Sequence, residues 1–210
     1  MFKAIDSILE QAPALPVVTI HSVEQASALA DALVSAGLPV IEVTLRTDCA
    51  LEAIRAMSEV DGAIVGAGTV LTPADLERVA SAGAAFAISP GCTGALYRAA
   101  AAADILFLPA VATASEIMTG LEHGHARFKF FPAEASGGIE ALKGFAGPFP
   151  DVKFCPTGGI STKNAPDYLR QRNVITVGGS WMAPQDAIAA EDWARIRALA
   201  NDCVNTCKTN

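Results

Sequence analysis

Residues 40–66 read VIEVTLRTDCALEAIRAMSEVDGAIVG. The short apolar run Val40–Val43 predicts a buried strand, residues 48–58 are helix-like, and Gly62–Gly66 is the next apolar run. Strands that alternate with helices in this way form βα units, in which the strands lie parallel in one sheet. This stretch therefore predicts an α/β fold built from repeated βα units.

The same pattern recurs along the whole chain, in eight apolar runs whose starts lie roughly 20 to 25 residues apart. The expected strands are Pro16–Ile20, Val40–Val43, Gly62–Gly66, Ala85–Ser89, Ile105–Leu108, Arg127–Phe130, Val152–Cys155 and Val174–Val177. The expected helices are 23–36, 48–58, 73–82, 94–103, 114–122, 137–146, 163–171 and 191–206, with an extra N-terminal helix over 2–11. Eight such units predict a single (β/α)8 barrel, or TIM barrel, over residues 1–210. The alternative is an open doubly wound sheet.

The composition limits the classes of binding partner and the cellular compartment that we expect. The formal net charge of −7 argues against nucleic-acid binding, which needs a basic face. The five cysteines include no Cys-x-x-Cys pair, which is typical of free thiols in a reducing cytoplasm. Residues 1–15 lack the apolar core of a signal peptide, and glycines and a proline interrupt the uncharged stretch 79–97. We expect a cytoplasmic protein with no membrane partner.

Polar residues, glycines and one proline cluster at the expected carboxyl ends of the strands, where barrels have their active sites. They are Glu42, Thr44, Arg46, Gly68, Thr69, Ser89, Pro90, Gly91, Thr157, Gly158, Gly159, Gly178, Gly179 and Ser180. Two Gly-Gly pairs, 158–159 and 178–179, follow strands seven and eight. Glycine lets backbone N–H groups approach an anion closely, so these pairs predict a phosphate site despite the negative net charge.

Lys129 is a single amine among aromatic residues in Arg-Phe-Lys-Phe-Phe-Pro, residues 127–132. An apolar environment favours the neutral amine, which is the nucleophile that forms Schiff bases with carbonyl compounds. Strand alternation places Phe128 and Phe130 on one face, against the helices, and Lys129 and Phe131 on the other, inside the barrel.

The same alternation turns Glu42 inward from strand two. Alternate strands of a barrel contribute to the same interior layer, so Glu42 and Lys129 are expected to face each other. A carboxylate near a lysine is placed to transfer protons. The alternative for Glu42 and Lys129 is a buried ion pair with a structural role. The alternative for Arg46 is a solvated charge on a loop.

The histidines and cysteines predict no metal site. His123 and His125 precede strand six, at the opposite end of the barrel from the expected site, and His21 has no partner that would make it a ligand. We expect Cys155 to be a buried core residue and not a nucleophile. We therefore expect no metal.

Six motifs carry a resemblance to a known family. They are IEVTLRT (41–47), VGAGTVL (65–71), SPG (89–91), FKFFPAE (128–134), FCPTGGI (154–160) and VGGSW (177–181). Together they resemble the class I aldolases of 2-dehydro-3-deoxy-6-phosphogluconate (KDPG), often also active on 4-hydroxy-2-oxoglutarate (KHG). The motifs are in the family's order and span nearly the whole chain.

The resemblance implies a lyase of the Entner–Doudoroff pathway that cleaves KDPG to pyruvate and D-glyceraldehyde 3-phosphate, and KHG to pyruvate and glyoxylate. It implies a homotrimeric (β/α)8 barrel with no metal or other cofactor, acting on a phosphorylated 2-keto acid. The implied roles are the Schiff base for Lys129 and general acid/base catalysis for Glu42. The implied binding residues are Arg46 and Thr69 for the pyruvate carboxylate, Pro90 and Phe131 for the pocket wall, Thr157 for the sugar hydroxyls, and Gly158, Gly159, Gly179 and Ser180 for the phosphate.

The chain departs from the family pattern at two places. Ala110 stands where the family usually has glycine after Pro109, and Cys92 replaces a larger apolar residue. These changes bear on loop shape and aldehyde preference. Leu45-Arg46-Thr47 favours the gluconate substrate over its galactonate epimer. Two other interpretations are a phosphosugar isomerase or epimerase and a non-catalytic phosphosugar-binding barrel.

Overall fold

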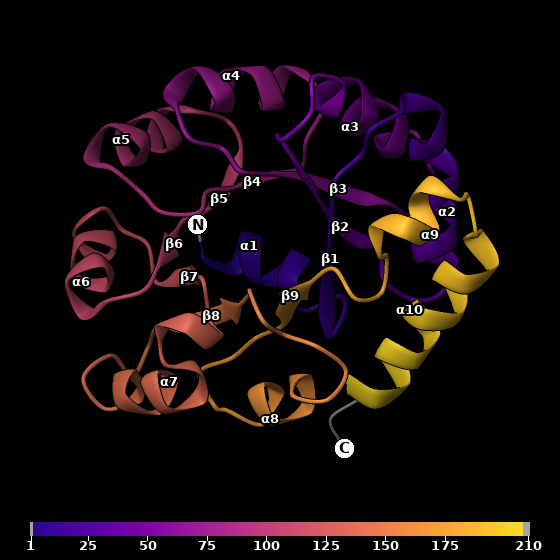
Figure 1. The fold of residues 1–210 in the computed structure, drawn as a ribbon. Helices are drawn as coiled ribbons and strands as arrows, with labels where there is room; N and C mark the ends of the chain where they lie inside the picture. The colour runs from indigo at the N-terminus through magenta and orange to yellow at the C-terminus, as the bar shows by residue number, and fades with distance from the viewer. Residues whose placement is uncertain (1, 208–210) are drawn as a thin grey trace.

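The computed structural model describes residues 2–207 as a ring of strands surrounded by helices, with one helix across the ring (Figure 1). The strands are β1 (Ala14–Val18), β2 (Val40–Thr44), β3 (Ile64–Gly68), β4 (Phe86–Ile88), β5 (Leu106–Leu108), β6 (Ala110–Val111), β7 (Arg127–Phe130), β8 (Lys153–Pro156) and β9 (Val177–Gly179). The α-helices are α1 (Phe2–Leu9), α2 (Ala26–Ser35), α3 (Ala50–Ser58), α4 (Pro73–Ser81), α5 (Gly94–Ala102), α6 (Ala114–Glu122), α7 (Gly138–Ala146), α8 (Ala165–Leu169), α9 (Gln185–Ala189) and α10 (Trp193–Cys207). Short 3-10 helices, η1 (Val23–Gln25) and η2 (Glu134–Ser136), precede α2 and α7.

All strand pairings are parallel, in the orders β5-β4-β3-β2-β1-β9 and β6-β7-β8. Single bridges, Phe154 with Val174 and Thr157 with Gly178, join the β8 segment to the β9 segment. β5 corresponds to the expected fifth strand, Ile105–Leu108, and β6 continues beyond it after Pro109, whose nitrogen carries no hydrogen to donate. The (β/α)8 barrel is confirmed, and the open doubly wound sheet is wrong.

The two faces of the strands form two separate cores. Ile41 and Val43 of β2 and Phe128 and Phe130 of β7 belong to the larger core, between the sheet and the outer helices. A smaller core inside the barrel contains Leu15, Val40, Phe86, Ile88, Leu108 and Cys155. The predicted outward direction of the two phenylalanines is confirmed.

The N-terminal helix α1 covers one end of the barrel. Ile5, Ile8 and Leu9 of this helix pack into the interior core. Arg127, the first residue of β7, donates two hydrogen bonds to Asp6, at 2.7 and 2.9 Å. Because the N-terminal ends of the strands are covered in this way, the opposite, carboxyl ends are the ones left to form a site.

Helix starts beside the carboxyl ends of the strands are fixed by side chains. Thr72 and Thr113 each form a capping box, with Asp75 and Glu116 respectively. Thr93 caps α5 by accepting a hydrogen bond from the backbone of Leu96 at 3.2 Å. Such caps satisfy backbone N–H groups that the first turn of a helix leaves free.

Two details of the sequence prediction need correction. The eighth strand is Val177–Gly179, whereas the apolar run predicted Val174–Val177. Val174 makes only an isolated bridge, and the ladder with β1 begins where Val177 pairs with Ala14. The second detail is α9, which the sequence did not predict because the helix is only five residues long.

Candidate active site

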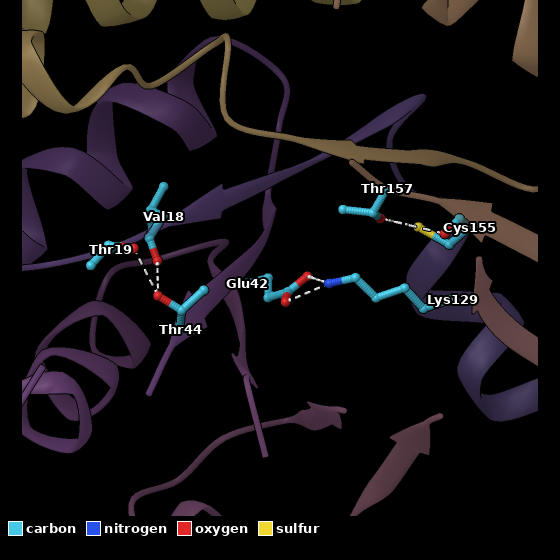
Figure 2. Close-up of polar contacts among 7 residues, drawn as sticks. All are labelled: Val18, Thr19, Glu42, Thr44, Lys129, Cys155 and Thr157. Atoms are coloured by element: carbon cyan, nitrogen blue, oxygen red, sulfur yellow. Dashed lines mark hydrogen bonds and ion pairs between the residues drawn. The ribbon is translucent and has the colours of Figure 1, made fainter. Parts of the chain in front are cut away.

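The barrel interior holds a buried ion pair between Lys129 of β7 and Glu42 of β2. Lys129 Nζ lies 2.8 Å from Oε1 and 3.0 Å from Oε2 of Glu42 (Figure 2). The two side chains are 7% and 2% exposed. The prediction that these residues face each other across the barrel is confirmed, since both point inward from their strands.

A glycine on the next strand makes room for this pair. Gly68 ends β3, beside Thr44 of β2. A methyl group placed on Gly68 would overlap the carboxylate of Glu42. Only glycine therefore lets Glu42 extend across β3 towards the lysine.

A cavity of about 340 Å³ opens at the carboxyl ends of the strands. Its lining residues are Val17, Thr19, Arg46, Phe131, Thr157, Gly158, Gly159, Ile160, Gly179, Ser180, Ala183 and Gln185. Val17 lies in register with Glu42, and Lys129 Nζ lies 5.5 Å from the centre of the Phe131 ring. The cavity and the ion pair are thus adjacent, and seven residues that the sequence singled out line this one space.

The loop after β8 has the backbone that its glycines predict. Gly158 and Gly159 have φ angles of 99° and 80°, a left-handed conformation that favours glycine. The preceding loop packs behind it, with the backbone N–H groups of Ala133 and Glu134 donating to the carbonyls of Thr157 (2.8 Å) and Gly158 (3.1 Å). These bonds fix the loop relative to β7 and Lys129.

A second contact ties this loop region to the helix that follows it. The hydroxyl of Tyr168, on α8, donates to the carboxylate of Glu134. The phenol is fully buried, and this burial, together with the neighbouring carboxylate, raises the pKa of Tyr168. The phenol therefore stays protonated and keeps donating at neutral pH.

Thr69 and Pro90 lie elsewhere around the opening. Thr69 borders a second cavity of about 360 Å³, and Arg46 borders both cavities. Thr69 has a φ of 62°, which is unusual for a β-branched residue. Pro90 is half-buried after β4 and lines neither cavity.

Cys155, His123 and His21 lie in surroundings that indicate no catalytic or metal-binding role. Cys155 pairs in register with Lys129, and burial raises the pKa of its thiol to about 12, so it is protonated at neutral pH. His123 stacks on Tyr97 with 4.7 Å between ring centres, and His21 is exposed. These positions agree with the structural interpretation of all three.

The sequence prediction missed five lining residues: Val17, Thr19, Ile160, Ala183 and Gln185. Alternation along β1 could have identified Val17 and Thr19, because both fall on the inward face that contains Leu15. Gln185 begins α9, and no sequence signal marked that short helix.

Within residues 2–207, no three His, Cys, Asp or Glu side chains lie together as a metal site would require. No helix in the same range is both long enough and apolar enough to cross a membrane.

Known proteins share both the sequence and the fold. A family model described as KDPG and KHG aldolase matches residues 5–199. The KHG/KDPG aldolase of Escherichia coli (strain K12) is 52% identical over 204 residues, covering 97% of this chain and 96% of that protein. Among solved structures, the KDPG aldolase of Zymomonas mobilis ZM4 with 3-phosphoglycerate has a TM-score of 0.93 at 48% identity, covering 97% of this chain and 96% of that one. The KDPG aldolase of Legionella pneumophila, with pyruvate captured at low pH as a covalent carbinolamine, has a TM-score of 0.92 at 46% identity and covers 95% and 97% of the two chains.

Fold, site and relatives together define an aldolase, a carbon–carbon lyase built on a (β/α)8 barrel. More narrowly, the chain belongs to the KDPG and KHG aldolase family, because the family model and the relatives cover nearly its whole length.

Proposed function

We propose that this chain is a class I aldolase that cleaves KDPG to pyruvate and D-glyceraldehyde 3-phosphate, and KHG to pyruvate and glyoxylate. The observation that carries this proposal is the buried pair of Lys129 and Glu42 beside a cavity lined by two glycine loops. A lysine amine forms Schiff bases with 2-keto acids, and a carboxylate at hydrogen-bond distance can take and return its proton. The names of the relatives support the same substrates.

In the first stage, the ammonium group of Lys129 gives one proton to Glu42, 2.8 Å away. The neutral amine adds to the C2 carbonyl of the substrate and forms a carbinolamine. Glu42 then returns its proton to the departing hydroxyl, which leaves as water, and an iminium remains. The carbinolamine captured in the Legionella pneumophila enzyme supports this sequence of steps.

In the second stage, the iminium withdraws electrons from the C3–C4 bond. Glu42 removes the proton of the C4 hydroxyl, the C3–C4 bond breaks, and the electron pair is held as an enamine while the aldehyde leaves. Glu42 returns the proton to C3. Water then hydrolyses the new iminium, which releases pyruvate and the amine of Lys129.

Binding groups for both ends of the substrate surround this centre. Arg46 and Thr69 hold the pyruvate carboxylate, and Phe131 shapes the pocket wall. Pro90, which follows β4 and lines neither cavity, is assigned to the wall only by the resemblance to the family. Arg46 borders the cavity, and its guanidinium suits a carboxylate.

The phosphate lies at the two glycine loops. Gly158, Gly159 and Gly179 offer backbone N–H groups without side chains in the way, and Ser180 adds a hydroxyl. Thr157 faces the same cavity and contacts the sugar hydroxyls. This arrangement supplies local donors for an anion in a protein whose net charge is −7.

The whole activity belongs to a single domain, residues 1–210, which works in the cytoplasm as a homotrimer. The Schiff base on Lys129 supplies the electron sink, so the reaction uses no metal and no other cofactor. The partner is a small phosphorylated 2-keto acid, with no nucleic acid or membrane involved.

A substrate comparison tests this proposal. Pyruvate release, measured by coupling to lactate dehydrogenase, is expected from KDPG and, more slowly, from KHG. Release from the galactonate epimer is expected to be slower than from KDPG. Faster cleavage of that epimer would change the assigned substrate, and no pyruvate from any of the three would contradict the function.

Substitution of Gly159 by alanine is expected to raise the KM for KDPG by about tenfold, with a smaller effect on KHG cleavage. The added methyl group would lie 2.5 Å from Cγ of Glu134, and the φ of 80° is unfavourable for alanine. Both effects move the loop that holds the phosphate. KHG has no phosphate, so its cleavage depends less on this loop. Steady-state kinetics on the two substrates measure the difference.

Gly83→Ala is the matched control, because Gly83 has a similar φ of 85° and an added methyl group there meets nothing within 4 Å. It follows α4, away from the cavity, so its strain is expected to lower stability without changing KM. Equal losses on KDPG and KHG in Gly159→Ala would argue against the phosphate site.

A further inference from the structure

Thr19 lines the cavity from a position next to the layer of Glu42. Thr19 follows β1 directly and, together with Val17, lines the cavity. Val17 is in register with Glu42, so Thr19 lies one layer nearer to the open end of the barrel. β1 itself lies between β2, which carries Glu42, and β9, which carries Gly179.

Two neighbours fix the direction of the hydrogen bonds at Thr19. The Thr44 hydroxyl oxygen lies 3.1 Å from the carbonyl oxygen of Val18 and 2.8 Å from the hydroxyl oxygen of Thr19 (Figure 2). A carbonyl oxygen only accepts, so Thr44 donates its single proton to Val18. If Thr44 donated to Thr19 instead, its lone pairs would face those of the buried carbonyl.

The direction of the second bond follows from the first. Because the proton of Thr44 is used on Val18, Thr19 must donate its own proton to Thr44. The oxygen of Thr19 then has only lone pairs left for the cavity. Towards the cavity, the hydroxyl group of Thr19 can therefore accept a hydrogen bond but cannot donate one.

We propose that Thr19 is a specificity-determining residue that accepts a hydrogen bond from the substrate hydroxyl between the cleaved bond and the phosphate. This inference rests on the proposed function, in which Glu42 acts at C4 and the phosphate on C6 lies at the glycine loops. KDPG carries a hydroxyl, the one on C5, between these two points. KHG has a carboxylate at C5, which offers no proton at neutral pH and is repelled by an oxygen that only accepts.

The test compares KDPG with its 5-deoxy analogue in the wild-type protein and in Thr19→Val, which keeps the shape and removes the acceptor. The wild-type protein is expected to cleave KDPG with a kcat/KM about tenfold above that of the analogue. Thr19→Val is expected to lose most of this preference by losing activity on KDPG. Thr19→Ser keeps the hydroxyl and is expected to retain the preference.

A second variant tests the role of Thr44. Thr44→Val removes the acceptor for the Thr19 proton, so that Thr19 can donate into the cavity. The ratio of KHG to KDPG cleavage is then expected to rise. Thr176→Val is the control, since the hydroxyl of Thr176 is also buried and donates to a carbonyl, that of Ala12 at 2.9 Å, but outside the cavity. It is expected to leave both ratios unchanged.

Failure of this assignment can be told from failure of the function. If Thr19→Val still prefers KDPG over the 5-deoxy analogue as strongly as the wild type does, the assignment is overturned while the aldolase function stands. If the wild-type protein releases no pyruvate from KDPG, the proposed function fails and the assignment fails with it.

Discussion

Lys129→Arg is expected to lower kcat for KDPG cleavage by about 10⁴-fold or more. Arginine keeps the positive charge that Glu42 faces in the barrel, so the buried carboxylate is not left without a partner. A guanidinium is not deprotonated in proteins and cannot act as the amine nucleophile. Pyruvate release in the lactate dehydrogenase assay measures the loss, and circular dichroism checks the fold.

Lys143→Arg is the matched control for this variant. Lys143 is an exposed residue of α7 that pairs with Glu140 at 2.7 Å, far from any proposed role in the chemistry. It is expected to keep full activity. A Lys129→Arg protein that retained a tenth of the wild-type rate of pyruvate release would contradict the Schiff-base role of Lys129, because a guanidinium cannot form the imine.

Glu42→Gln is expected to lower kcat by about 10²- to 10⁴-fold, because an amide neither takes nor returns the protons that each step moves. Glutamine has the shape of glutamate, so it fits the space that Gly68 leaves open. The variant should therefore fold and still accept a hydrogen bond from Lys129.

Two measurements separate the acid/base role of Glu42 from a purely structural one. Exchange of the C3 protons of pyruvate with deuterated water reports reprotonation, and it is expected to fall in parallel with kcat. Trapping of pyruvate on Lys129 by borohydride over long incubation reports imine formation, and it is expected to persist. Normal exchange in a Glu42→Gln protein with low kcat would assign the C3 proton transfer to another residue.

Much of the site could be predicted from the sequence because barrel strands alternate strictly between two environments. Phe128 and Phe130 are apolar enough to define the outer face of β7. Alternation along the strand then predicts that Lys129 points into the barrel. The layer rule then placed Glu42 opposite, and the structure shows the contact. Glycine positions were equally informative, since Gly158 and Gly159 both adopt the left-handed backbone that a close loop needs.

The remaining features depend on contacts that no local pattern records. The apolar run at residues 174–177 has the composition of a strand, but the ladder with β1 starts only at its last residue, Val177. The division of the fifth strand at Pro109 reflects a change of partner, from β4 on one side to β7 on the other. The polarity of Thr19 depends on Thr44, which is 25 residues away in sequence.

The proposed function requires Lys129 to form a Schiff base with pyruvate. The most direct measurement is reduction of the wild-type protein with borohydride in the presence of pyruvate, followed by peptide mass spectrometry. We expect one pyruvate-dependent adduct, located on Lys129, in the segment of residues 127–132. An unmodified Lys129, or an adduct on Lys143 or Lys153 in its place, would contradict it.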